Sequence, residues 1–354
     1  MITILGATGY TGRLVANAID AAGLPYRLAG RSLSKLCELA DSLSARPACL
    51  QVDVRRADDL PCLLKGTRVL INCVGPFTDL GEAVVRATVL GGVHYLDTTN
   101  ELGFVVRLRA YDGLAKSNRV IVVPACAFEV AVSDCAVAMM VAKMQEGAYR
   151  RADVVYHVPG KGASDGTRRS AIRALGTSWF VYQNGRLHGR LPGSRVRQFD
   201  LWYGRKMALS FPSCETVAWP LHVPVQSVGS WMTGSPGMFL WAPLLVPLFA
   251  LLARSVLREL PLGLLKLYPA VQDGIRSRDE FEVAVFVQRG SGESCRVSVI
   301  GQGVYEQTAL ILARAVGQIL SGAVTERGLL SPARVLGEGC LQALGLRVEE
   351  EQLD

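Results

Sequence analysis

The hydrophobic pattern at the start of the chain predicts a strand, a turn and a helix in succession. Residues 2–5 form a short apolar run that is typical of a buried strand. Three glycines then follow at three-residue intervals, Gly6, Gly9 and Gly12. Apolar residues recur with helical spacing through residues 14–19. The glycines therefore occupy the turn between a strand and a helix.

The same alternation of short apolar runs and helical segments continues to about residue 130. Strands that alternate with helices predict an α/β fold, a Rossmann-type doubly wound parallel sheet, over residues 1–130. The expected strands after the first are residues 26–30, 48–54, 69–74, 92–97 and 120–123.

The pattern changes after residue 130 and predicts a second, α+β domain over residues 131–302 that contains an antiparallel sheet. Helices in residues 303–354 are candidates to pack back on the first domain. The expected elements are a helix at 132–143, a strand at 153–158, a hairpin formed by 281–288 and 295–300, and a helix at 307–320.

The glycine turn has the features of a dinucleotide-binding turn. Gly6 permits a tight backbone, Gly9 lets a pyrophosphate approach, and Gly12 lets the helix pack against the strand. The N-terminus of the helix favours phosphate groups. The alternative is a structural glycine turn. The expected contacts to the cofactor here are Gly6, Thr8, Gly9, Tyr10, Thr11 and Gly12.

Arg31 indicates which dinucleotide is bound. In NAD enzymes an acidic residue about 20 residues after the turn binds the ribose 2′-hydroxyl, whereas an arginine accommodates a 2′-phosphate. Arg31 follows the second strand, and no acid stands there, so we expect NADP(H), with help from Ser32 and Lys35. Arg31 is alternatively a solvated turn residue.

Asp53, at the end of the third expected strand, is expected either to contact the adenine edge of the cofactor or to cap the next helix. Further expected cofactor contacts are Val54, Asn72, Val74, Gly75, Pro76 and Cys126.

Composition and charge indicate which classes of ligand or partner the protein could bind. Half of the 354 residues are hydrophobic and the formal net charge is +7, which suits anionic ligands or acidic membrane surfaces. The arginines are scattered without interleaved aromatic residues, so no nucleic-acid partner is expected. The nine cysteines form no CxxC pair and no Cys/His cluster, so we expect reduced thiols in a cytoplasmic protein without a metal site. Because the first strand is predicted to start at residue 2, no signal peptide is expected.

One stretch is unusually apolar. Residues 217–253 contain no Asp, Glu, Lys or Arg, and residues 238–253 are nearly all apolar. This run is short for a membrane-spanning helix, and Pro243 and Pro247 interrupt it. It is expected to be a helix lying on a lipid surface, a buried helix in an oligomer interface, or a lid over an apolar substrate.

Several motifs together resemble the saccharopine dehydrogenase-like oxidoreductases, a family that includes trans-acting enoyl reductases and a lipid-droplet-associated protein. Near residue 126, Ala127 and Glu129 replace the family's Gly and Asp, and Asn100 also replaces a usual glycine, which indicates an altered pocket. The matching segments are residues 6–12 with 29–31, residues 74–82 and 92–101, and more weakly residues 164–170 and 303–309.

This resemblance implies a nicotinamide-dependent reduction. Four residues are candidates to donate a proton to the substrate or to orient the donor. Tyr95 and Asp97 lie two apart on one strand and therefore share a face. Tyr95 is expected to donate to a carbonyl oxygen or protonate an enolate, with Asp97 or Glu101 orienting it or acting as the acid, and Glu129 is a further acid. The alternatives are core packing for Tyr95 and a capping role for Asp97.

The sequence thus supports an NADPH-dependent reductase that acts on a C=C bond, or a C=N or C=O bond, of a hydrophobic acyl, polyketide or isoprenoid substrate. The expected assembly is a homodimer with peripheral membrane or lipid contact. The rival hypothesis is a lipid-surface protein that binds NADP(H) without turnover.

Overall fold

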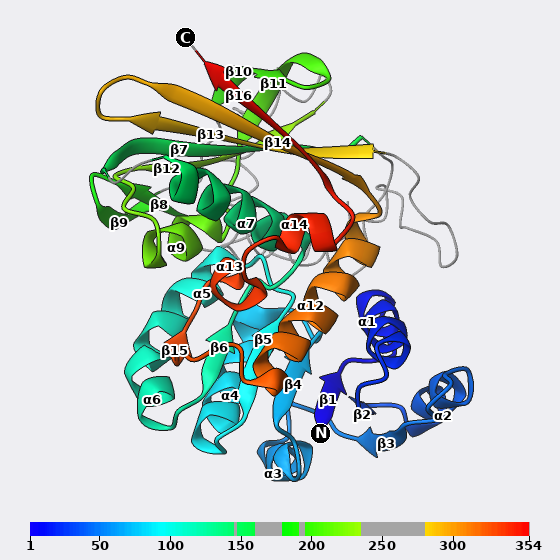
Figure 1. The fold of residues 1–354 in the computed structure, drawn as a ribbon. Coiled ribbons are helices and arrows are strands. Elements are labelled where there is room, and N and C mark those ends of the chain that lie inside the picture. Colours follow the sequence, from blue (N-terminus) through cyan, green and yellow to red (C-terminus); the bar gives the residue numbers. More distant parts are fainter. Residues whose placement is uncertain (145–146, 160–178, 191–194, 235–279, 354) are drawn as a thin grey trace, which may run out of the picture. The chain divides into compact units, whose positions relative to one another are not determined.

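A computed structural model describes residues 1–144, 147–159, 179–190, 195–234 and 280–353 of the chain (Figure 1). The chain divides into two compact units, which are described separately below. Unit 1 contains Met1–Asn100, Phe104–Phe128 and Tyr305–Leu336, and unit 2 contains Glu101–Gly103, Glu129–Val304 and Gly337–Asp354.

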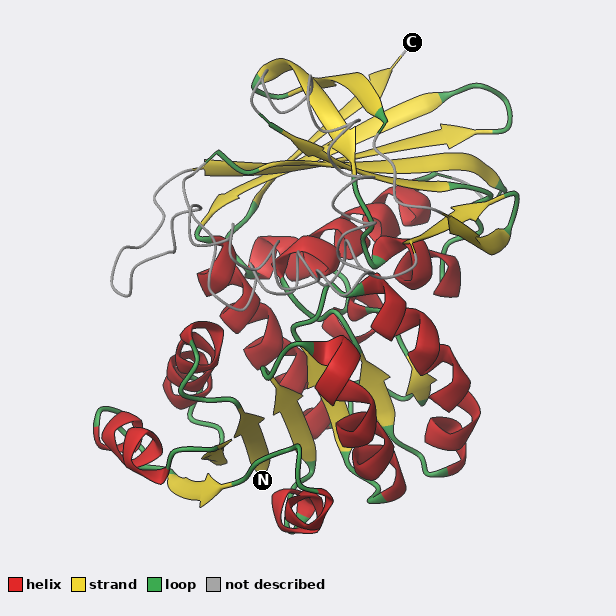
Figure 2. Cartoon of the chain, turned by 180° about the vertical axis from the view of Figure 1, so that it is seen from behind, coloured by secondary structure: helices red, strands yellow, loops and turns green. Residues whose placement is uncertain are grey.

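Unit 1 consists of strands and helices in alternation, as Figure 2 shows in yellow and red. Its strands are β1 (Ile2–Leu5), β2 (Tyr26–Gly30), β3 (Ala48–Gln51), β4 (Val69–Asn72), β5 (His94–Asp97), β6 (Ile121–Val123) and β15 (Gly328–Leu329). Its helices are α1 (Tyr10–Ala21), α2 (Leu33–Asp41), α3 (Leu60–Leu64), α4 (Phe77–Leu90), α5 (Leu102–Leu108, which begins in unit 2), α6 (Asp112–Ser117), α12 (Val304–Ser321) and α13 (Pro332–Leu336).

The seven strands of unit 1 form one parallel sheet in the order β15-β6-β5-β4-β1-β2-β3. Every residue of β1 and β4 is buried, as expected for strands covered on both faces. On α1, the spacing of Val15, Ala16 and Ile19 gives one buried face. The expected doubly wound parallel sheet is therefore confirmed.

Unit 2 is built mainly of strands. Its described strands are β7 (Tyr149–His157), β8 (Trp179–Gln183), β9 (Arg186–Arg190), β10 (Val196–Leu201), β11 (Gly204–Ser210), β12 (Val228–Thr233), β13 (Glu280–Arg289), β14 (Ser294–Gln302) and β16 (Arg347–Leu353). Its described helices are α7 (Phe128–Lys143), α9 (Glu215–Ala218) and α14 (Cys340–Ala343).

The second sheet is mixed, with the order β10-β11-β12-β7-β13-β14-β16 and with β8 and β9 attached at β12. The expected hairpin is confirmed as β13 and β14, which pair antiparallel. Strands β7 and β12 pair parallel, so this sheet is not purely antiparallel. Five strands of this sheet, β7, β10, β11, β12 and β13, supply one apolar cluster: Val155, Phe199, Leu201, Ala208, Trp231 and Ala284.

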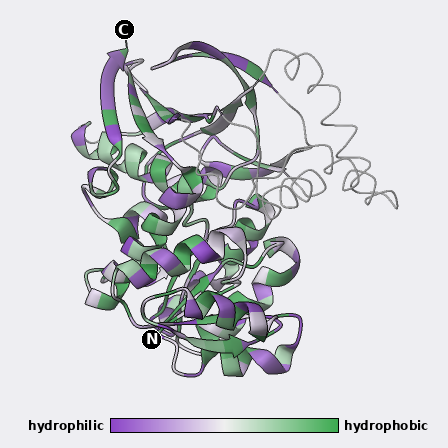
Figure 3. Cartoon of the chain, turned by 90° about the vertical axis from the view of Figure 1, so that its right-hand side faces the viewer, coloured by the Kyte–Doolittle hydropathy of each residue, from purple (hydrophilic) through white to green (hydrophobic). Residues whose placement is uncertain are grey.

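The last part of the chain differs from the expectation. Helix α12 and strand β15 belong to unit 1, but residues after Leu336 belong to unit 2 and end in a strand, β16, that was not expected. Strand β16 is polar, as its purple colour in Figure 3 shows. This suits an edge strand, because β16 pairs with β14 at the end of the order of the described strands. The apolar segment 238–253 and the motif at 164–170 lie outside the described residues.

Candidate functional site

The candidate site begins where the strand order of unit 1 reverses. The chain runs from β1 outward to β2 and β3, then returns to β4 on the other side of β1. In open α/β sheets, ligands bind at the carboxyl ends of the strands beside this switch point. The glycine turn after Leu5 and the loop after Asn72 both start there, because Leu5 and Asn72 are aligned across β1 and β4.

Gly6 and Gly12 of this turn lie where a side chain would clash, and Gly9 lies where a side chain would fit only tightly. Gly6 has φ +80°, and a Cβ on it would lie 2.7 Å from Cγ2 of Val74. A Cβ on Gly12 would overlap the Gly6 carbonyl oxygen and lie 2.9 Å from Cα of Ala7. A Cβ on Gly9 would lie 3.3 Å from the same carbonyl oxygen. The turn is therefore held close to both β4 and α1.

Helix α1 starts at Tyr10 with no side chain capping it, because Gly9 occupies the N-cap position. Thr8 accepts a hydrogen bond at its carbonyl oxygen from Nε of Arg13, and the ring of Tyr10 packs edge-on against Tyr305. Phosphate groups bind at helix N-termini of this kind, so the residues present fit the pyrophosphate of a dinucleotide. Thr11 lies in the same first turn and is partly exposed.

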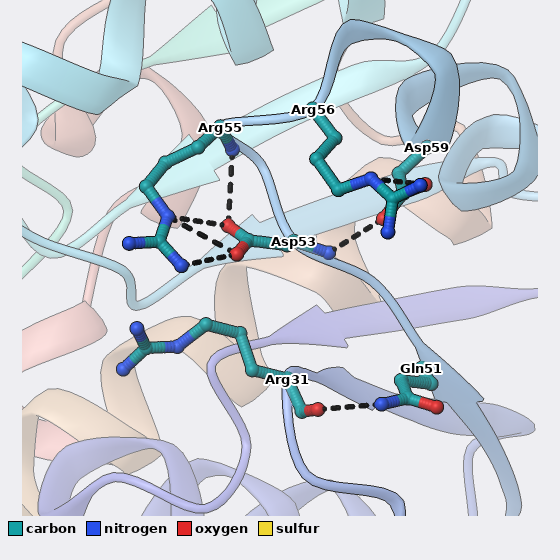
Figure 4. Close-up of polar contacts among 6 residues, drawn as sticks. All are labelled: Arg31, Gln51, Asp53, Arg55, Arg56 and Asp59. Carbon is teal, nitrogen blue, oxygen red and sulfur yellow. Dashed lines mark hydrogen bonds and ion pairs between the residues drawn. The ribbon is translucent and has the colours of Figure 1, made fainter.

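The loops after β2 and β3 carry the charged residues of the site (Figure 4). Arg31 follows β2 directly and is exposed, and its carbonyl oxygen accepts from Nε2 of Gln51 at 2.9 Å. Asp53 does not cap the following helix. Its carboxylate accepts from Nε of Arg55 at 2.9 and 3.0 Å, and its N–H donates to Oδ2 of Asp59 at 2.8 Å.

The neighbours of Arg31 and Asp53 have local structural roles. Ser32 is the N-cap of α2, and its Oγ accepts from the backbone N–H of Lys35 at 3.5 Å. Lys35 is exposed, and Val54 is buried. Arg31, directly after β2, and Lys35, in the first turn of α2, present exposed positive charge where a 2′-phosphate would be accommodated.

Asn72, Tyr95 and Asp97 form a buried network at the ends of β4 and β5. Nδ2 of Asn72 donates to the Tyr95 hydroxyl at 3.1 Å, and Oδ1 of Asn72 accepts from the Val74 N–H at 2.9 Å. Tyr95 is fully buried, and burial, together with the charge of Asp97, raises its pKa well above the ordinary value. Tyr95 therefore keeps its proton.

Asp97 holds two loops together. Its Oδ1 accepts from the N–H groups of Thr99 at 3.0 Å and Ala125 at 2.8 Å, and its carbonyl oxygen accepts from the N–H of Cys126 at 2.8 Å. Cys126 is buried beside it. Gly75 and Pro76 end the neighbouring loop, where Pro76 is the N-cap of α4. The predicted residues of unit 1 thus gather at the carboxyl ends of β1 to β6.

The remaining acid candidates belong to unit 2, where a second acid was missed by sequence reasoning. Glu101 is buried, and Glu129 lies in the first turn of α7. Burial, with the charge of Glu215 adding to it, raises the pKa of Glu129. Glu215 is fully buried, and burial raises its pKa too. No motif or periodicity marks Glu215 in the sequence.

Glu215 is the centre of a hydrogen-bonded cluster with Ser133, Tyr156 and Ser230. The Ser133 hydroxyl donates to Oε1 of Glu215 at 3.0 Å, and the Ser230 hydroxyl donates to Oε2 at 3.4 Å. The Tyr156 hydroxyl contacts Oε1 and also lies 2.8 Å from the carbonyl oxygen of Glu129. The Tyr156 hydroxyl has one proton and therefore donates to one of these two oxygens only. If it donates to the Glu129 carbonyl oxygen, a proton on the Glu215 carboxyl supplies the hydrogen bond between Glu215 and Tyr156.

Unit 2 also contains a buried pair of a histidine and an aspartate. Nε2 of His222 lies 2.6 Å from Oδ1 of the buried Asp134. Within the described ranges, no three His, Cys, Asp or Glu side chains are placed to hold a metal ion. Among the helices that the structure describes, none has the length and apolar character needed to span a membrane.

The fold and the glycine turn define a dinucleotide-binding domain. Its family follows from comparison with known proteins, because residues 2–146 match the model of the saccharopine dehydrogenase NADP binding domain. Residues 2–146 are therefore similar to an NADP-binding domain of the saccharopine dehydrogenase family. The expected family and cofactor are both confirmed.

Two relatives and one solved structure illustrate the likeness. A lipid droplet localized protein of Caenorhabditis elegans is 31% identical over 148 residues, which cover 38% of this chain and 35% of that protein. A Mycobacterium tuberculosis protein named as a trans-acting enoyl reductase is 31% identical over 187 residues, covering 50% and 44%. The alignments thus span less than half of either relative.

The solved structure of saccharopine dehydrogenase (L-Glu forming) from Saccharomyces cerevisiae aligns with 100% of this chain and 99% of its own, with a TM-score of 0.65 and 13% identity. This likeness shows a shared fold that extends beyond the N-terminal domain.

Proposed function

We propose that this protein is an NADPH-dependent reductase that adds a hydride and a proton across a C=C bond, or a C=N or C=O bond, of a hydrophobic small-molecule or lipid-like substrate. The observation that carries the proposal is the glycine turn followed by Arg31 within an NADP-binding domain. The C=C bond is placed first because one relative is named as an enoyl reductase.

The chain's own part in this reaction is to bind and orient. The nicotinamide cofactor supplies the hydride when it is bound. Gly6, Gly9 and Gly12 let the backbone approach the pyrophosphate, and Arg31 pairs with the 2′-phosphate. We assign Asn72, Val74 and Pro76, with Gly75 and Cys126, to the nicotinamide half, since they follow β4 and β6 at the ligand-binding edge.

Glu129 is the proposed proton donor. Its raised pKa keeps it protonated to higher pH than an ordinary carboxyl, which suits a general acid. It stands three residues after Cys126, which Asp97 anchors. Tyr95, Asp97 and Glu101 are assigned to orienting the reacting groups, because all three are buried and the first two are hydrogen-bonded in place.

The test is NADPH oxidation by the full chain against panels of apolar enoyl, imine and ketone compounds. Turnover with an apolar enoyl compound supports the proposal, and no turnover with any apolar acceptor contradicts it. Glu129→Gln is expected to lower kcat by about 100-fold or more, because the acid is lost, while the Kd for NADPH stays unchanged. An unchanged kcat in Glu129→Gln removes Glu129 from the mechanism.

A second candidate is an NADP(H)-binding protein of lipid surfaces without turnover. The name of the C. elegans relative and the apolar run at residues 238–253 favour it. Flotation with liposomes tests it, using the full chain and a variant lacking 238–253. Flotation that depends on this segment, without NADPH oxidation, supports the second candidate, whereas a chain that never floats contradicts it.

The proposed setting in either case is a cytoplasmic homodimer with peripheral lipid contact. Sedimentation at several protein concentrations tests the dimer, which is expected to persist in the presence of NADP⁺. A monomer at all concentrations contradicts this part of the proposal.

A further inference from the structure

Two arginines from neighbouring strands extend beside one carboxylate. Arg31 follows β2, and Arg55 lies in the loop after β3, where Gly30 and Gln51 are aligned across the two strands. Figure 4 shows both guanidinium groups on the same side of Asp53, and the charge of Arg31 acts on that carboxylate. Arg31, Asp53 and Arg55 are named here the charged triplet.

Within the charged triplet, Asp53 is bound closely by Arg55. Nε of Arg55 donates to both carboxylate oxygens, Nη2 forms a second contact with Oδ2, and the Arg55 N–H donates to Oδ1 at 3.1 Å. Hydrogen bonds from the Arg55 side chain and backbone lower the pKa of Asp53 to about 2, so it is ionised at any physiological pH. Nη1 of Arg55 makes none of these contacts.

An ionised carboxylate at this place poses a problem for NADP(H). In NAD enzymes the acid that binds the ribose 2′-hydroxyl follows the second strand. Asp53 follows the neighbouring strand β3, close enough for the charge of Arg31 to act on it, and its negative charge repels a 2′-phosphate bound there. With Arg55 in place, the charged triplet has a net charge of one positive unit. If Arg55 were removed, Asp53 would cancel the charge of Arg31 instead.

We propose that Arg55 is a specificity-determining residue for NADP(H), which neutralises Asp53 and presents its remaining N–H groups to the 2′-phosphate beside Arg31. This inference deepens the proposed function and rests on its cofactor. Arg55 is solvent-accessible, with 60% of its side chain exposed, so it can meet a ligand without a change of fold. An arginine suits this role because its planar guanidinium binds carboxylate and phosphate with separate edges.

Arg56 offers a matched control. It is the adjacent residue with the same charge, its side chain is 73% exposed, and its Nε lies 3.9 Å from Oδ1 of Asp59 rather than near Asp53. Figure 4 shows it directed toward Asp59. Arg56→Ala therefore removes one positive charge from the same loop and leaves the side-chain contacts of the charged triplet in place. It also keeps the backbone N–H of residue 56, which donates to the Asp53 carbonyl oxygen at 2.8 Å.

The experiment is calorimetric titration of the full chain with NADP⁺ and NAD⁺, for the wild type and for Arg55→Ala, Arg55→Lys and Arg56→Ala. Arg55→Ala is expected to weaken NADP⁺ binding by about 10-fold or more, the scale of a charge-assisted hydrogen bond, with NAD⁺ binding unchanged or tighter. Arg55→Lys is expected to fall between the wild type and Arg55→Ala. Arg56→Ala is expected to match the wild type for both ligands.

A double variant separates the two parts of the role. Asp53→Asn with Arg55→Ala removes the repelling carboxylate, so NADP⁺ affinity is expected to recover partly from that of Arg55→Ala. If Arg55→Ala weakens NADP⁺ and NAD⁺ equally, Arg55 only shapes the loop, and the inference is overturned. It is also overturned if Arg55→Ala behaves like Arg56→Ala.

Failure of the proposed function gives a different result. A wild-type chain that binds neither nucleotide contradicts the cofactor and the inference together. A chain whose nucleotide affinities follow the pattern above but which oxidises no NADPH supports Arg55 as the specificity residue and contradicts the reductase.

Discussion

Gly12 shows how a single missing side chain sets the geometry of the site. It lies one turn into α1, and the contacts that a Cβ would make there are backbone atoms of Gly6 and Ala7, which cannot move aside as a flexible side chain could. Close approach of α1 to β1 therefore depends on glycine at this position, independently of any bound ligand.

Gly12→Ala is expected to lower the free energy of unfolding by about 2 kcal/mol, the cost of forcing extra volume into a packed position. Urea-induced unfolding measures this change. Gly317→Ala is the matched control, because Gly317 also lies within a helix but a Cβ there meets nothing within 4 Å. It is expected to stabilise the protein by about 0.5–1 kcal/mol, as Gly-to-Ala changes in open helix positions do. Equal effects of the two changes would contradict the close-packing argument.

The Tyr95 hydroxyl is expected to contribute to stability through its hydrogen bond with Asn72 in the buried network. Tyr95→Phe removes the acceptor for Nδ2 of Asn72 without changing the ring, so a buried donor loses its partner. The free energy of unfolding is expected to fall by about 1–3 kcal/mol, and NADP⁺ affinity is expected to fall with it, because Asn72 also holds the Val74 N–H. Unchanged stability in Tyr95→Phe would show that the hydrogen bond contributes nothing to the fold.

At the scale of elements, α7, β7, α9 and β12 are joined by the Glu215 cluster. Each contributes one side chain to it: Ser133, Tyr156, Glu215 and Ser230. Because burial raises the pKa of Glu215 and of Glu129, the folded protein holds protons that the unfolded chain releases above the ordinary carboxyl pKa. Their contribution to stability is present at low pH and is lost as pH rises through the raised values.

The free energy of unfolding is therefore expected to decrease as pH rises above 4.5, the ordinary pKa of a glutamate carboxyl. Glu215→Gln cannot ionise, so it is expected to reduce this slope by up to about 1.4 kcal/mol per pH unit. Denaturant unfolding at a series of pH values measures the slope. Glu338→Gln, at an exposed position of unit 2, is expected to leave it unchanged. A slope that is the same in Glu215→Gln and wild type would argue against a proton on Glu215.

The helices and strands differ in how far the sequence predicts them. Strands β1 and β4 follow from short apolar runs, because strands buried on both faces are apolar almost throughout. The two-residue strand β15 was not predicted, because Gly328 and Leu329 are too short a run to indicate a strand. Strand β16 escapes such reasoning, since its sequence contains three successive glutamates, Glu349–Glu351, and it is held by pairing with β14 at the sheet edge. Long-range pairing of this kind leaves no local pattern.

The residues of the candidate site also differ in how far the sequence predicts them. The glycine spacing and Arg31 are local signals, and they predicted the place and the type of the cofactor. The Glu215 cluster joins side chains that are 59 and 82 residues apart, so only the fold brings them together. Arg55 carried no motif, and its role emerges from its contact with Asp53. Residue spacing therefore predicts a ligand-binding turn of the backbone, whereas a network of side chains that are distant in sequence is recognised only in the structure.

At the scale of the whole molecule, unit 1 is not a continuous stretch of sequence. Residues Tyr305–Leu336 supply α12, β15 and α13, and β15 pairs with β6. The N–H of Phe128 donates to Oγ1 of Thr308, which ties the end of the N-terminal part to α12. The family match ends at residue 146 and therefore omits part of the unit that folds around the glycine turn.

A fragment of residues 1–146 is therefore expected to bind NADP⁺ at least about 10-fold more weakly than the full chain, because its binding-competent state is less populated. Residues 1–128 joined by a flexible linker to residues 304–336 restore unit 1 and are expected to recover most of the affinity. Calorimetry with circular dichroism measures binding and folding of both. Full affinity in the 1–146 fragment would show that α12 and β15 are dispensable.

The central claim, that unit 1 selects NADP(H) through Arg31 at the end of β2, is tested most directly by one titration series. The full chain and Arg31→Ala are titrated with NADP⁺ and NAD⁺ under the same buffer and salt conditions. We predict that the wild type binds NADP⁺ at least about 10-fold more tightly than NAD⁺ and that Arg31→Ala loses this preference while keeping its affinity for NAD⁺. Equal or tighter binding of NAD⁺ by the wild type would contradict the claim.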